Sequence, residues 1–365
     1  MKRKLTTDCT GTDRMVHESI SEHSGQLANL DELQSIVACF PQEIDYAFGY
    51  GSGVFAQNHS LEGKDKPMID LIFSVPNPQS WHEENLRLHP DHYAPLCRTL
   101  GSGFITSVQT SGGAGLFFNP LIDSPINDSG NTRQIKYGVI RTSDFKDDLL
   151  HWKYLYVAGR LQKPTVHIPL NNSMETLIHS QWQQRNLTSA ISTSLLLQAS
   201  RNKHDMKFNL DHLFETIASL SYMGDPRMKA GAEDPLKIQK LVHSNGQYDR
   251  FCGLYQDSLA KFEHSGLIHV DYSSKSIDLQ NIVSCASAKK ELWNNLPLPL
   301  SKLYDENIRT DENIVLSNAL EQIVSPAAKF QSMKGLISAG IVKSFRYAAN
   351  KFQKGGGANI LKFLK

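Results

Sequence analysis

Two apolar runs in the first quarter of the chain have the length and composition of buried β-strands. The first is Ile44–Tyr50, and the second is Met68–Val75, which carries a single carboxylate, Asp70. The glycine-rich turn 51–53 follows the first run, and a polar loop leads to the second. A run with helical spacing of apolar residues, Leu27–Phe40, comes before both strands. The pattern therefore predicts a helix and then two strands joined by a tight turn and a long loop.

The spacing of apolar residues predicts three further elements before residue 165. A helix starts at Pro78 with Trp81 and Leu88 facing inward, and residues 133–140 form a strand on which Lys136 is exposed. A helix over residues 144–156 places its large apolar side chains on one face. Two glycine clusters, 101–103 and 112–115, match neither a P-loop nor a dinucleotide fingerprint, and they predict close approach of the backbone to a ligand or strand.

The pattern changes at residues 167–169, after which helical spacing dominates. Residues 171–201 and 208–221 are predicted to be helices, and residues 248–296 mix helices with short alternating runs, which is typical of a winged-helix-like domain. We expect an α+β protein with a mixed sheet and flanking helices, followed by a mainly helical domain and an amphipathic helix. The predicted boundaries are a flexible lead at 1–25, a first domain at 26–168, a second at 169–320 and the helix at 327–354.

The last segment combines an apolar stripe with a strongly basic composition. Apolar residues recur every three or four positions from Phe330 to Phe352, while residues 322–365 contain eight Lys or Arg and no Asp or Glu. The preceding 321 residues carry thirty basic and thirty-seven acidic residues. A helix of this pattern either packs on a protein core or lies in a membrane interface. The absence of acids favours an interfacial helix at an anionic membrane surface.

Composition limits the remaining classes of protein. The chain has 365 residues, 40% of them hydrophobic, and a net charge of +1, which is typical of a globular protein of about two domains. It has no apolar window of transmembrane length. Its five scattered cysteines form no CxxC pair, so a reducing compartment fits. The N-terminus lacks a signal-peptide core and is a poor mitochondrial presequence because it contains acids.

The turn at 51–53 and Asp70 together form a recognisable chemical pattern. Backbone N–H groups at Gly51 and Ser52 can hold phosphate oxygens, and a carboxylate on the next strand can hold the Mg²⁺ of a nucleotide triphosphate. This arrangement resembles the nucleotidyltransferase superfamily signature, although an ordinary hairpin would give the same turn. Lys64 and Lys66 in the loop either pair with triphosphate oxygens or are solvated.

Several motifs in order resemble one family. YGSGVF, IDLIF, GAGLFFN, IKYGVI, LYVAGRLQKP and GDPRM…EDP are similar to the mitochondrial CDP-diacylglycerol synthases, also called translocator assembly and maintenance proteins. The resemblance implies a phosphatidate cytidylyltransferase that makes CDP-diacylglycerol and pyrophosphate from CTP and phosphatidic acid in the cardiolipin pathway, with Mg²⁺. It also implies peripheral attachment to the matrix side of the mitochondrial inner membrane through the C-terminal helix.

The resemblance assigns roles to residues of this chain. Asp70, Ser52 and Lys66 are the expected catalytic residues. The expected nucleotide ligands are Tyr50, Gly51, Ser52, Gly53, Lys64, Arg160 and Lys163. The expected residues for the lipid phosphate are His82, Arg227 and Lys237, which would either contact it or support residues that do. A lone histidine, however, is more often a surface or core residue. Metal ligands would be Asp70 with Asp225 or Glu233.

One position departs from the superfamily pattern. The second acid of a DxD pair would fall at position 72, which is Ile72. The second hypothesis is therefore a catalytically weak nucleotidyltransferase-like membrane scaffold that acts in inner-membrane protein assembly. A nucleotidyltransferase acting on nucleic acid is disfavoured, because the body of the chain is acidic and nucleic-acid grooves are basic.

Overall fold

The computed structural model describes residues 30–55, 67–124, 133–201, 207–229, 234–244, 246–304 and 311–354, without the side chains of 201, 336 and 339–354. The predicted lead at 1–25, Lys64, Lys66 and Glu233 lie outside the described residues.

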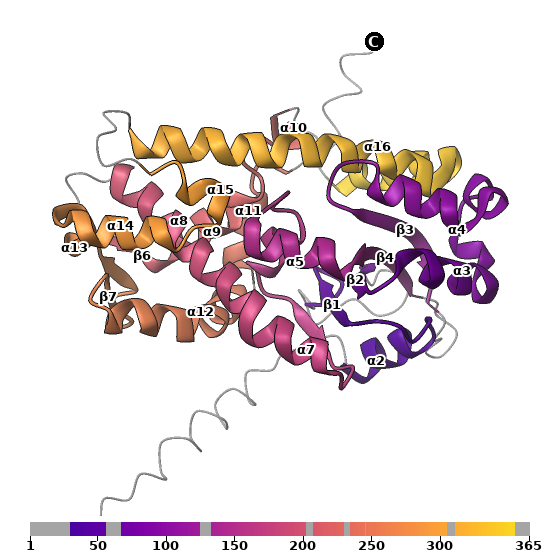
Figure 1. Cartoon of the computed structure of the whole chain (residues 1–365), viewed down its shortest axis with the longest axis horizontal. Helices are drawn as coiled ribbons and strands as arrows, with labels where there is room; N and C mark the ends of the chain where they lie inside the picture. The colour runs from indigo at the N-terminus through magenta and orange to yellow at the C-terminus, as the bar shows by residue number, and fades with distance from the viewer. Residues whose placement is uncertain are drawn as a thin grey trace, which may run out of the picture.

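A five-stranded mixed sheet forms the first half of the molecule (Figure 1). Its strand order is β3 (Leu116–Asp123), β4 (Gln134–Arg141), β2 (Ile69–Val75), β1 (Tyr46–Tyr50) and β5 (Val166–Ile168). Strands β2 and β4 run parallel, and the other neighbours are antiparallel. The predicted mixed sheet with flanking helices is confirmed.

Both faces of this sheet are covered, which explains why its strands are continuous apolar runs. Alternate residues Tyr46, Phe48 and Ile72 face the large helical core, whereas Leu71 and Phe73 face the opposite side. That opposite side is covered by α2 (Leu30–Ala38), α3 (Pro78–Leu88) and α4 (Pro95–Thr110), with the short 3₁₀ turn Pro90–His92 between α3 and α4.

The second half is mainly helical, as predicted. Helix α7 (Ser173–Leu177), a π-helical turn (Ile178–Gln183) and α8 (Gln184–Arg201) follow one another without a break. The other helices are α9 (Leu210–Leu220), α10 (Pro226–Lys229), α11 (Lys237–His243), α12 (Gln247–His264), α13 (Gln280–Ser284), α14 (Ala286–Asn294) and α15 (Leu298–Ser301).

A small antiparallel sheet accompanies these helices. Its order is β6 (Lys207–Asn209), β8 (Ser276–Asp278) and β7 (His269–Asp271), and the β7–β8 hairpin follows α12. Buried residues of this half, such as Phe214, belong to the same core cluster as Phe48 of β1. The structure thus joins the two halves through one core, and the boundary at residue 168 stays a prediction.

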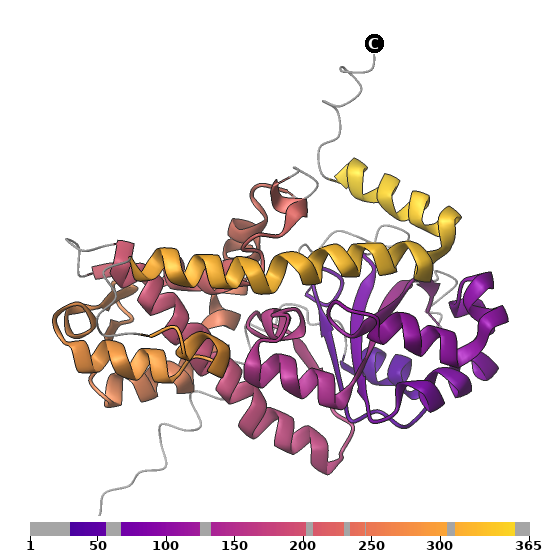
Figure 2. The same ribbon diagram turned by 45° about the horizontal axis from the view of Figure 1, so that its top comes forward.

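Helix α16 (Glu312–Lys354) lies across both halves, contacting α8 at one end and β3 and α4 further along (Figure 1). Figure 2 shows that it runs nearly straight along the molecule and then bends sharply, so that its last turns leave the body. None of the described helices is both long enough and apolar enough to cross a membrane.

Three local predictions were wrong. Leu88 is 42% exposed rather than inward-facing. The helix predicted over 144–156 is divided, because α5 (Thr142–His151) ends at Trp152 in the left-handed region and α6 (Val157–Leu161) starts separately. Gly101, with φ of 78°, forms a kink inside α4, and a Cβ added there would meet no atom within 4 Å, so it serves no close approach.

The second glycine cluster serves a close approach to helix α16, whereas the prediction named a ligand or a strand. A Cβ at Gly113 would lie 2.9 Å from Cβ of Phe330, and Gly112 lies under the ring of Phe330. Both glycines have positive φ. The turn before β3 is therefore the place where α16 comes down onto the sheet domain.

Candidate active site

The turn after β1 places an exposed serine next to a carboxylate. Gly51 has φ of 78°, and a Cβ there would lie 3.5 Å from Oδ2 of Asp70. Ser52 is exposed, while Gly53 is buried so closely that a Cβ would lie 2.0 Å from the Met68 carbonyl oxygen. Glycine is therefore required at 53 by space and favoured at 51 by backbone conformation. Ser52 is thus exposed at the surface, one residue after Gly51, whose backbone lies beside Asp70.

Asp70 lies at the point where three strands meet. It pairs with Tyr50 of β1 and with Lys136 of β4. The Lys136 ammonium lies 3.2 Å from Oδ1 of Asp70, and the two side chains are only 16% and 21% exposed. The prediction that Lys136 is exposed on its strand was wrong, because β4 lies beside β2 and turns this side chain toward the carboxylate.

Arg160 on α6 is stacked between two tyrosines. Its guanidinium carbon lies 4.3 Å from the ring centre of Tyr50 and 5.1 Å from that of Tyr156. The Tyr50 hydroxyl and the Arg160 Nε are both buried without a hydrogen-bond partner. Burial raises the pKa of Tyr50 despite its cationic neighbours. Two neighbouring donors that are buried and unsatisfied indicate a place where a polar ligand binds.

The pKa of Tyr156 indicates which cations lie close to one another at this site. Burial would raise the pKa of this phenol, but the nearby Arg160, Lys136 and Arg227 outweigh burial and hold it below its ordinary value. These three cations come from α6, β4 and α10, which are far apart in sequence. The fold thus brings basic residues from both halves of the chain to one site.

Lys163 carries a buried amino group that has no carboxylate partner within the described part of the chain. It is 8% exposed, its Nζ donates to Ser221 Oγ at 3.0 Å, and it faces the ring of Tyr222, as does Lys237. Burial, and then the positive charges of Arg160 and Lys237, lower its pKa well below the ordinary value. Buried cations generally need a counter-charge, so this cluster is suited to an anion.

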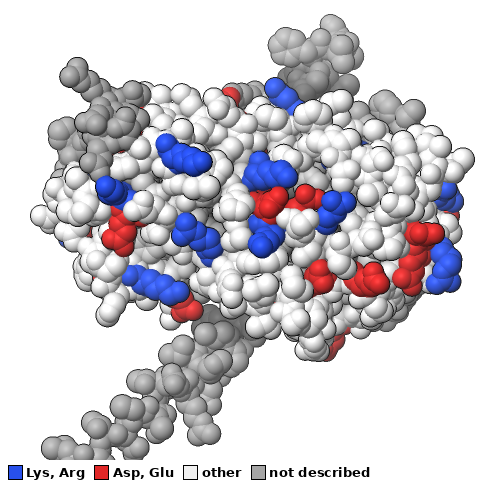
Figure 3. All heavy atoms as spheres, viewed as in Figure 1, with Lys and Arg blue, Asp and Glu red and all other residues white. Residues whose placement is uncertain are grey.

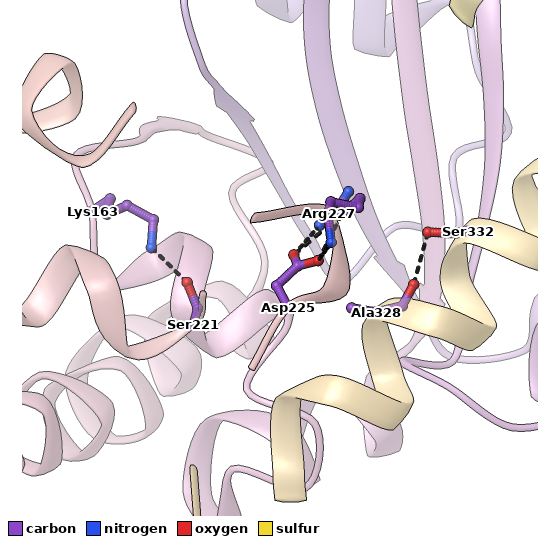
Figure 4. Close-up of polar contacts among 6 residues, drawn as sticks. All are labelled: Lys163, Ser221, Asp225, Arg227, Ala328 and Ser332. Carbon is purple, nitrogen blue, oxygen red and sulfur yellow. Dashed lines mark hydrogen bonds and ion pairs between the residues drawn. The ribbon is translucent and has the colours of Figure 1, made fainter. Parts of the chain in front are cut away.

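Helix α10 supplies Arg227 at the edge of the site, directly after the loop that carries Asp225. Figure 4 shows Arg227 in front of the sheet strands, between Lys163 and helix α16, with its guanidinium directed onto Asp225. The Nε–Oδ1 and Nη2–Oδ2 distances are 3.1 and 2.6 Å, and Asp225 is 1% exposed. Both carboxylate oxygens are therefore engaged, which argues against the predicted metal role of Asp225.

A buried carboxylate, Asp148, fixes the segment that carries Arg160. It accepts backbone N–H bonds from residues 154, 156, 157 and 158 at 2.7 to 3.1 Å. The amide of Asn186 on α8 accepts from Gln162 and donates to the carbonyl of Ala158. These contacts hold α6 against the helical half and position Arg160 and Lys163.

His82 does not belong to the site. It is fully buried between α3 and α4, and its two ring nitrogens are hydrogen-bonded to the Tyr93 hydroxyl at 2.8 Å and to Gln109 Oε1 at 2.9 Å. Burial lowers its pKa to about 4, so the ring is neutral at ordinary pH. His82 is therefore a core histidine with both ring nitrogens hydrogen-bonded, and a contact with a lipid phosphate is not supported.

The donor set near Asp70 suits a magnesium ion that is shared with a substrate. Mg²⁺ is commonly held by one or two carboxylates together with substrate phosphates. Asp70 is a partly exposed carboxylate beside the turn at Gly51. No group of three His, Cys, Asp or Glu side chains suited to a metal occurs among the described residues. Asp70 thus fits a metal that arrives with a nucleotide.

Sequence reasoning found part of this site and missed the rest. The structure gathers Tyr50, Gly51, Ser52, Asp70, Arg160, Lys163, Arg227 and Lys237 of the predicted residues. It adds Lys136, Tyr156, Tyr222 and the supporting Asp148. Only the pairing of β2 with β4 and the position of α6 could have indicated these additions.

Comparisons with known proteins point to one family. A family described as "Phosphatidate cytidylyltransferase, mitochondrial" matches residues 33–354. Proteins with the same name are similar to this chain. The Rattus norvegicus protein is 35% identical over 335 residues, covering 88% of this chain and 94% of the relative. The Schizosaccharomyces pombe protein is 34% identical over 349 residues, covering 89% and 84%. The Danio rerio protein is 36% identical over 332 residues, covering 87% and 93%. The chain therefore belongs to the mitochondrial phosphatidate cytidylyltransferase family.

Proposed function

We propose that this protein is a phosphatidate cytidylyltransferase, which makes CDP-diacylglycerol and pyrophosphate from CTP and phosphatidic acid. Beyond family membership, one observation carries the proposal. Arg160, which is half-buried, and Lys163, which is buried, are basic groups that form no ion pair with a carboxylate of the described residues, and they lie on the segment beside Tyr50. A triphosphate and a lipid phosphate are anions that would supply the missing charge.

The reaction needs charge neutralisation more than it needs a base. An oxygen of the phosphatidate phosphate is already anionic when it attacks the α-phosphorus of CTP. A bond forms between that oxygen and the α-phosphorus, and the bond to the β-phosphate oxygen breaks and leaves pyrophosphate. The site must therefore bring two polyanions together and offset their charge. A magnesium ion, held by Asp70, would supply part of this positive charge.

The residues divide between the two substrates by their place in the fold. The backbone N–H groups and hydroxyl at Gly51 and Ser52 would hold the β- and γ-phosphates of CTP. The unsatisfied donors of Tyr50 and Arg160 would bind the nucleotide next to this turn. Lys64 and Lys66, outside the described residues, stay candidates for the triphosphate.

Arg227 and Lys237 are the candidates for the lipid phosphate, Arg227 because its helix α10 and the loop before it contact α16, and Lys237 because it faces the same tyrosine as Lys163. A Cβ at Gly224 would lie 2.4 Å from Glu321 of α16, so the loop is packed directly against that helix. Figure 4 places Arg227 on the side of the site that faces α16. A lipid that approaches along α16 would meet these cations first.

The membrane contact is proposed from an unusual orientation of α16. Between residues 330 and 338 the apolar side chains Phe330, Met333 and Ile337 are 45%, 63% and 40% exposed. The polar side chains Gln331 and Lys334 are instead buried and donate to the carbonyls of Leu116 and Gln109. An apolar face turned outward on a basic helix is typical of an interfacial membrane helix.

The surface charge is consistent with this orientation. Figure 3 shows the described charged side chains of this face gathered around its centre, its left side and its lower right edge. Few of the described side chains in the upper right part, where α16 runs in Figure 1, are charged. The basic residues beyond 338, whose side chains are not described, would meet anionic headgroups. We infer a peripheral protein of mitochondria, on the matrix side of the inner membrane.

The activity is tested by product analysis with the purified full chain. Liposomes containing phosphatidic acid, CTP and Mg²⁺ should give CDP-diacylglycerol and pyrophosphate in equal amounts, and liposomes without phosphatidic acid should give neither. If the protein makes neither product but still binds cardiolipin liposomes, the scaffold hypothesis replaces the enzyme. Ile72, which is fully buried in the core, would then be the first position to examine.

The membrane contact is tested by adding a charge to the exposed apolar face. Met333→Glu should weaken binding to cardiolipin-containing liposomes by at least about tenfold, since burying a Met side chain contributes about 1.5–3 kcal/mol. Gln322→Glu adds the same charge at an exposed position earlier on α16 and is the matched control. Equal binding of both variants and the wild type would contradict the proposed contact.

A further inference from the structure

Lys136 and Asp70 face each other on neighbouring parallel strands. The register pairs Asp70 of β2 with Lys136 of β4, so both side chains project from the same face of the sheet. Their charged groups lie 3.2 Å apart, and each side chain keeps a small exposed fraction. The pair is thus half-buried and still accessible from the site.

The position of the Lys136 side chain is fixed by its surroundings. Its Nζ lies 4.7 Å from the ring centre of Phe118 on β3. That ring lies directly over Gly138, where a Cβ would come within 2.5 Å of it. The charge of Lys136 also acts on Tyr50 and Tyr156. Burial still raises the pKa of Tyr50 against this charge, whereas Arg160 and Lys136 together hold the pKa of Tyr156 below its ordinary value. Lys136 is therefore held among the residues assigned to the nucleotide.

Among the described residues, the positions considered for a second carboxylate do not offer a free one to a cation at Asp70. Ile72, two residues further along the same face, is fully buried and apolar. Asp225 has both oxygens on Arg227, and no cluster of three metal-binding side chains exists among the residues described. The group that faces Asp70 across the sheet is an ammonium ion and not a carboxylate.

We propose that Lys136 is a catalytic residue that contacts the α-phosphate of CTP and supplies the positive charge for which a second metal ion would otherwise be needed. This inference rests on the proposed function and adds that one metal ion suffices. As the lipid phosphate oxygen bonds to the α-phosphorus and pyrophosphate leaves, Lys136 keeps its proton and acts through charge alone. A lysine suits this role because it is a compact point charge with three donors.

The test combines metal counting with kinetics. Mn²⁺ bound per chain is counted by electron paramagnetic resonance in the presence of α,β-methylene-CTP, an analogue that cannot transfer its cytidylyl group. Wild type should bind one Mn²⁺. Lys136→Met should keep that count and lower kcat about 100- to 1,000-fold, the usual effect of removing one charge-stabilising donor. Lys136→Arg should recover part of kcat. Lys261→Met, at an exposed position on α12, is the control and should match wild type.

Two results would overturn the inference. Two Mn²⁺ per wild-type chain would mean that a second metal is held after all, and this count needs no variant to fold. A Lys136→Met protein with changed Mn²⁺ affinity but wild-type kcat at saturating Mn²⁺ would mean that Lys136 only positions Asp70. If wild type itself makes no CDP-diacylglycerol, the proposed function fails, which is a separate outcome.

Discussion

Gly159→Ala should inactivate the protein by moving a helix rather than by removing a functional group. An added Cβ would lie 2.2 Å from Cβ of Ser221 and 2.8 Å from its Oγ. Ordinary carbon–carbon contacts are about 3.5–4.0 Å, so α6 must move by more than about 1 Å. Because α6 carries Arg160, and Lys163 follows it, both cations move with the helix. A misplacement of about 1 Å can lower activity roughly 100-fold.

The expected loss of stability is smaller than the loss of activity. Overpacking costs about 1–3 kcal/mol, whereas alanine in a helix would otherwise stabilise by about 0.5–1 kcal/mol relative to glycine. Gly103→Ala is the matched control, because Gly103 is helical and exposed and has no atom within 4 Å of its added Cβ. CTP turnover and Tm should fall for Gly159→Ala and stay unchanged or rise slightly for Gly103→Ala.

A second substitution tests whether the effect of Gly159→Ala is steric. Gly159→Ala combined with Ser221→Gly removes the atoms that collide, so Tm should recover toward wild type. Activity should recover only in part, because Lys163 loses its hydrogen bond to Ser221. Wild-type turnover and Tm in the single Gly159→Ala variant would refute the close approach of α6 to Ser221.

Three further predictions concern charge. Binding of CTP should raise the lowered pKa of Lys163 and so take up protons at a pH below the ordinary lysine pKa. Titration enthalpies in Tris and Hepes should then differ, and Lys163→Met should remove the difference. Asp148→Ala should cost more than about 3 kcal/mol of unfolding free energy in urea, because each buried N–H left unsatisfied costs about 1–3 kcal/mol; Asp147→Ala, at an exposed ion pair, should cost less than about 1 kcal/mol. Burial lowers the pKa of Lys334 to about 8, while an unfolded lysine titrates near about 10.4, so the unfolded chain binds more protons between these values. Unfolding free energy of wild type relative to Lys334→Met should therefore rise from pH 8 to pH 10; parallel curves would contradict the burial of this charge.

The sequence predicted the helices and strands better than it predicted which of them lie side by side. The apolar runs of β1 and β2 and the turn between them were visible, and so was Asp70. The partner of β2 was not visible, since parallel pairing with β4 depends on the course of the chain from Val75 to Gln134, which no local pattern encodes. Lys136 was therefore assigned to solvent although it lies against Asp70.

Helix α16 shows why an amphipathic pattern does not settle orientation. Its apolar stripe was clear, but the rule that apolar faces turn inward fails between residues 330 and 338. Backbone carbonyls at Leu116 and Gln109 need donors, and Gln331 and Lys334 satisfy them. The end of α5 was missed for a related reason, because Asp148 offers the following N–H groups a better acceptor than another helical turn.

The measurement that tests the central claim most directly is a single-turnover transfer of label from [α-³²P]CTP into lipid, comparing wild type with Asp70→Ala. Asp70 lies beside the Gly51 turn and opposite Lys136, so its loss should abolish labelled CDP-diacylglycerol while the protein stays folded and still binds liposomes. Labelled lipid formed by Asp70→Ala at the wild-type rate would show that the chemistry takes place elsewhere and would contradict the assignment of this site.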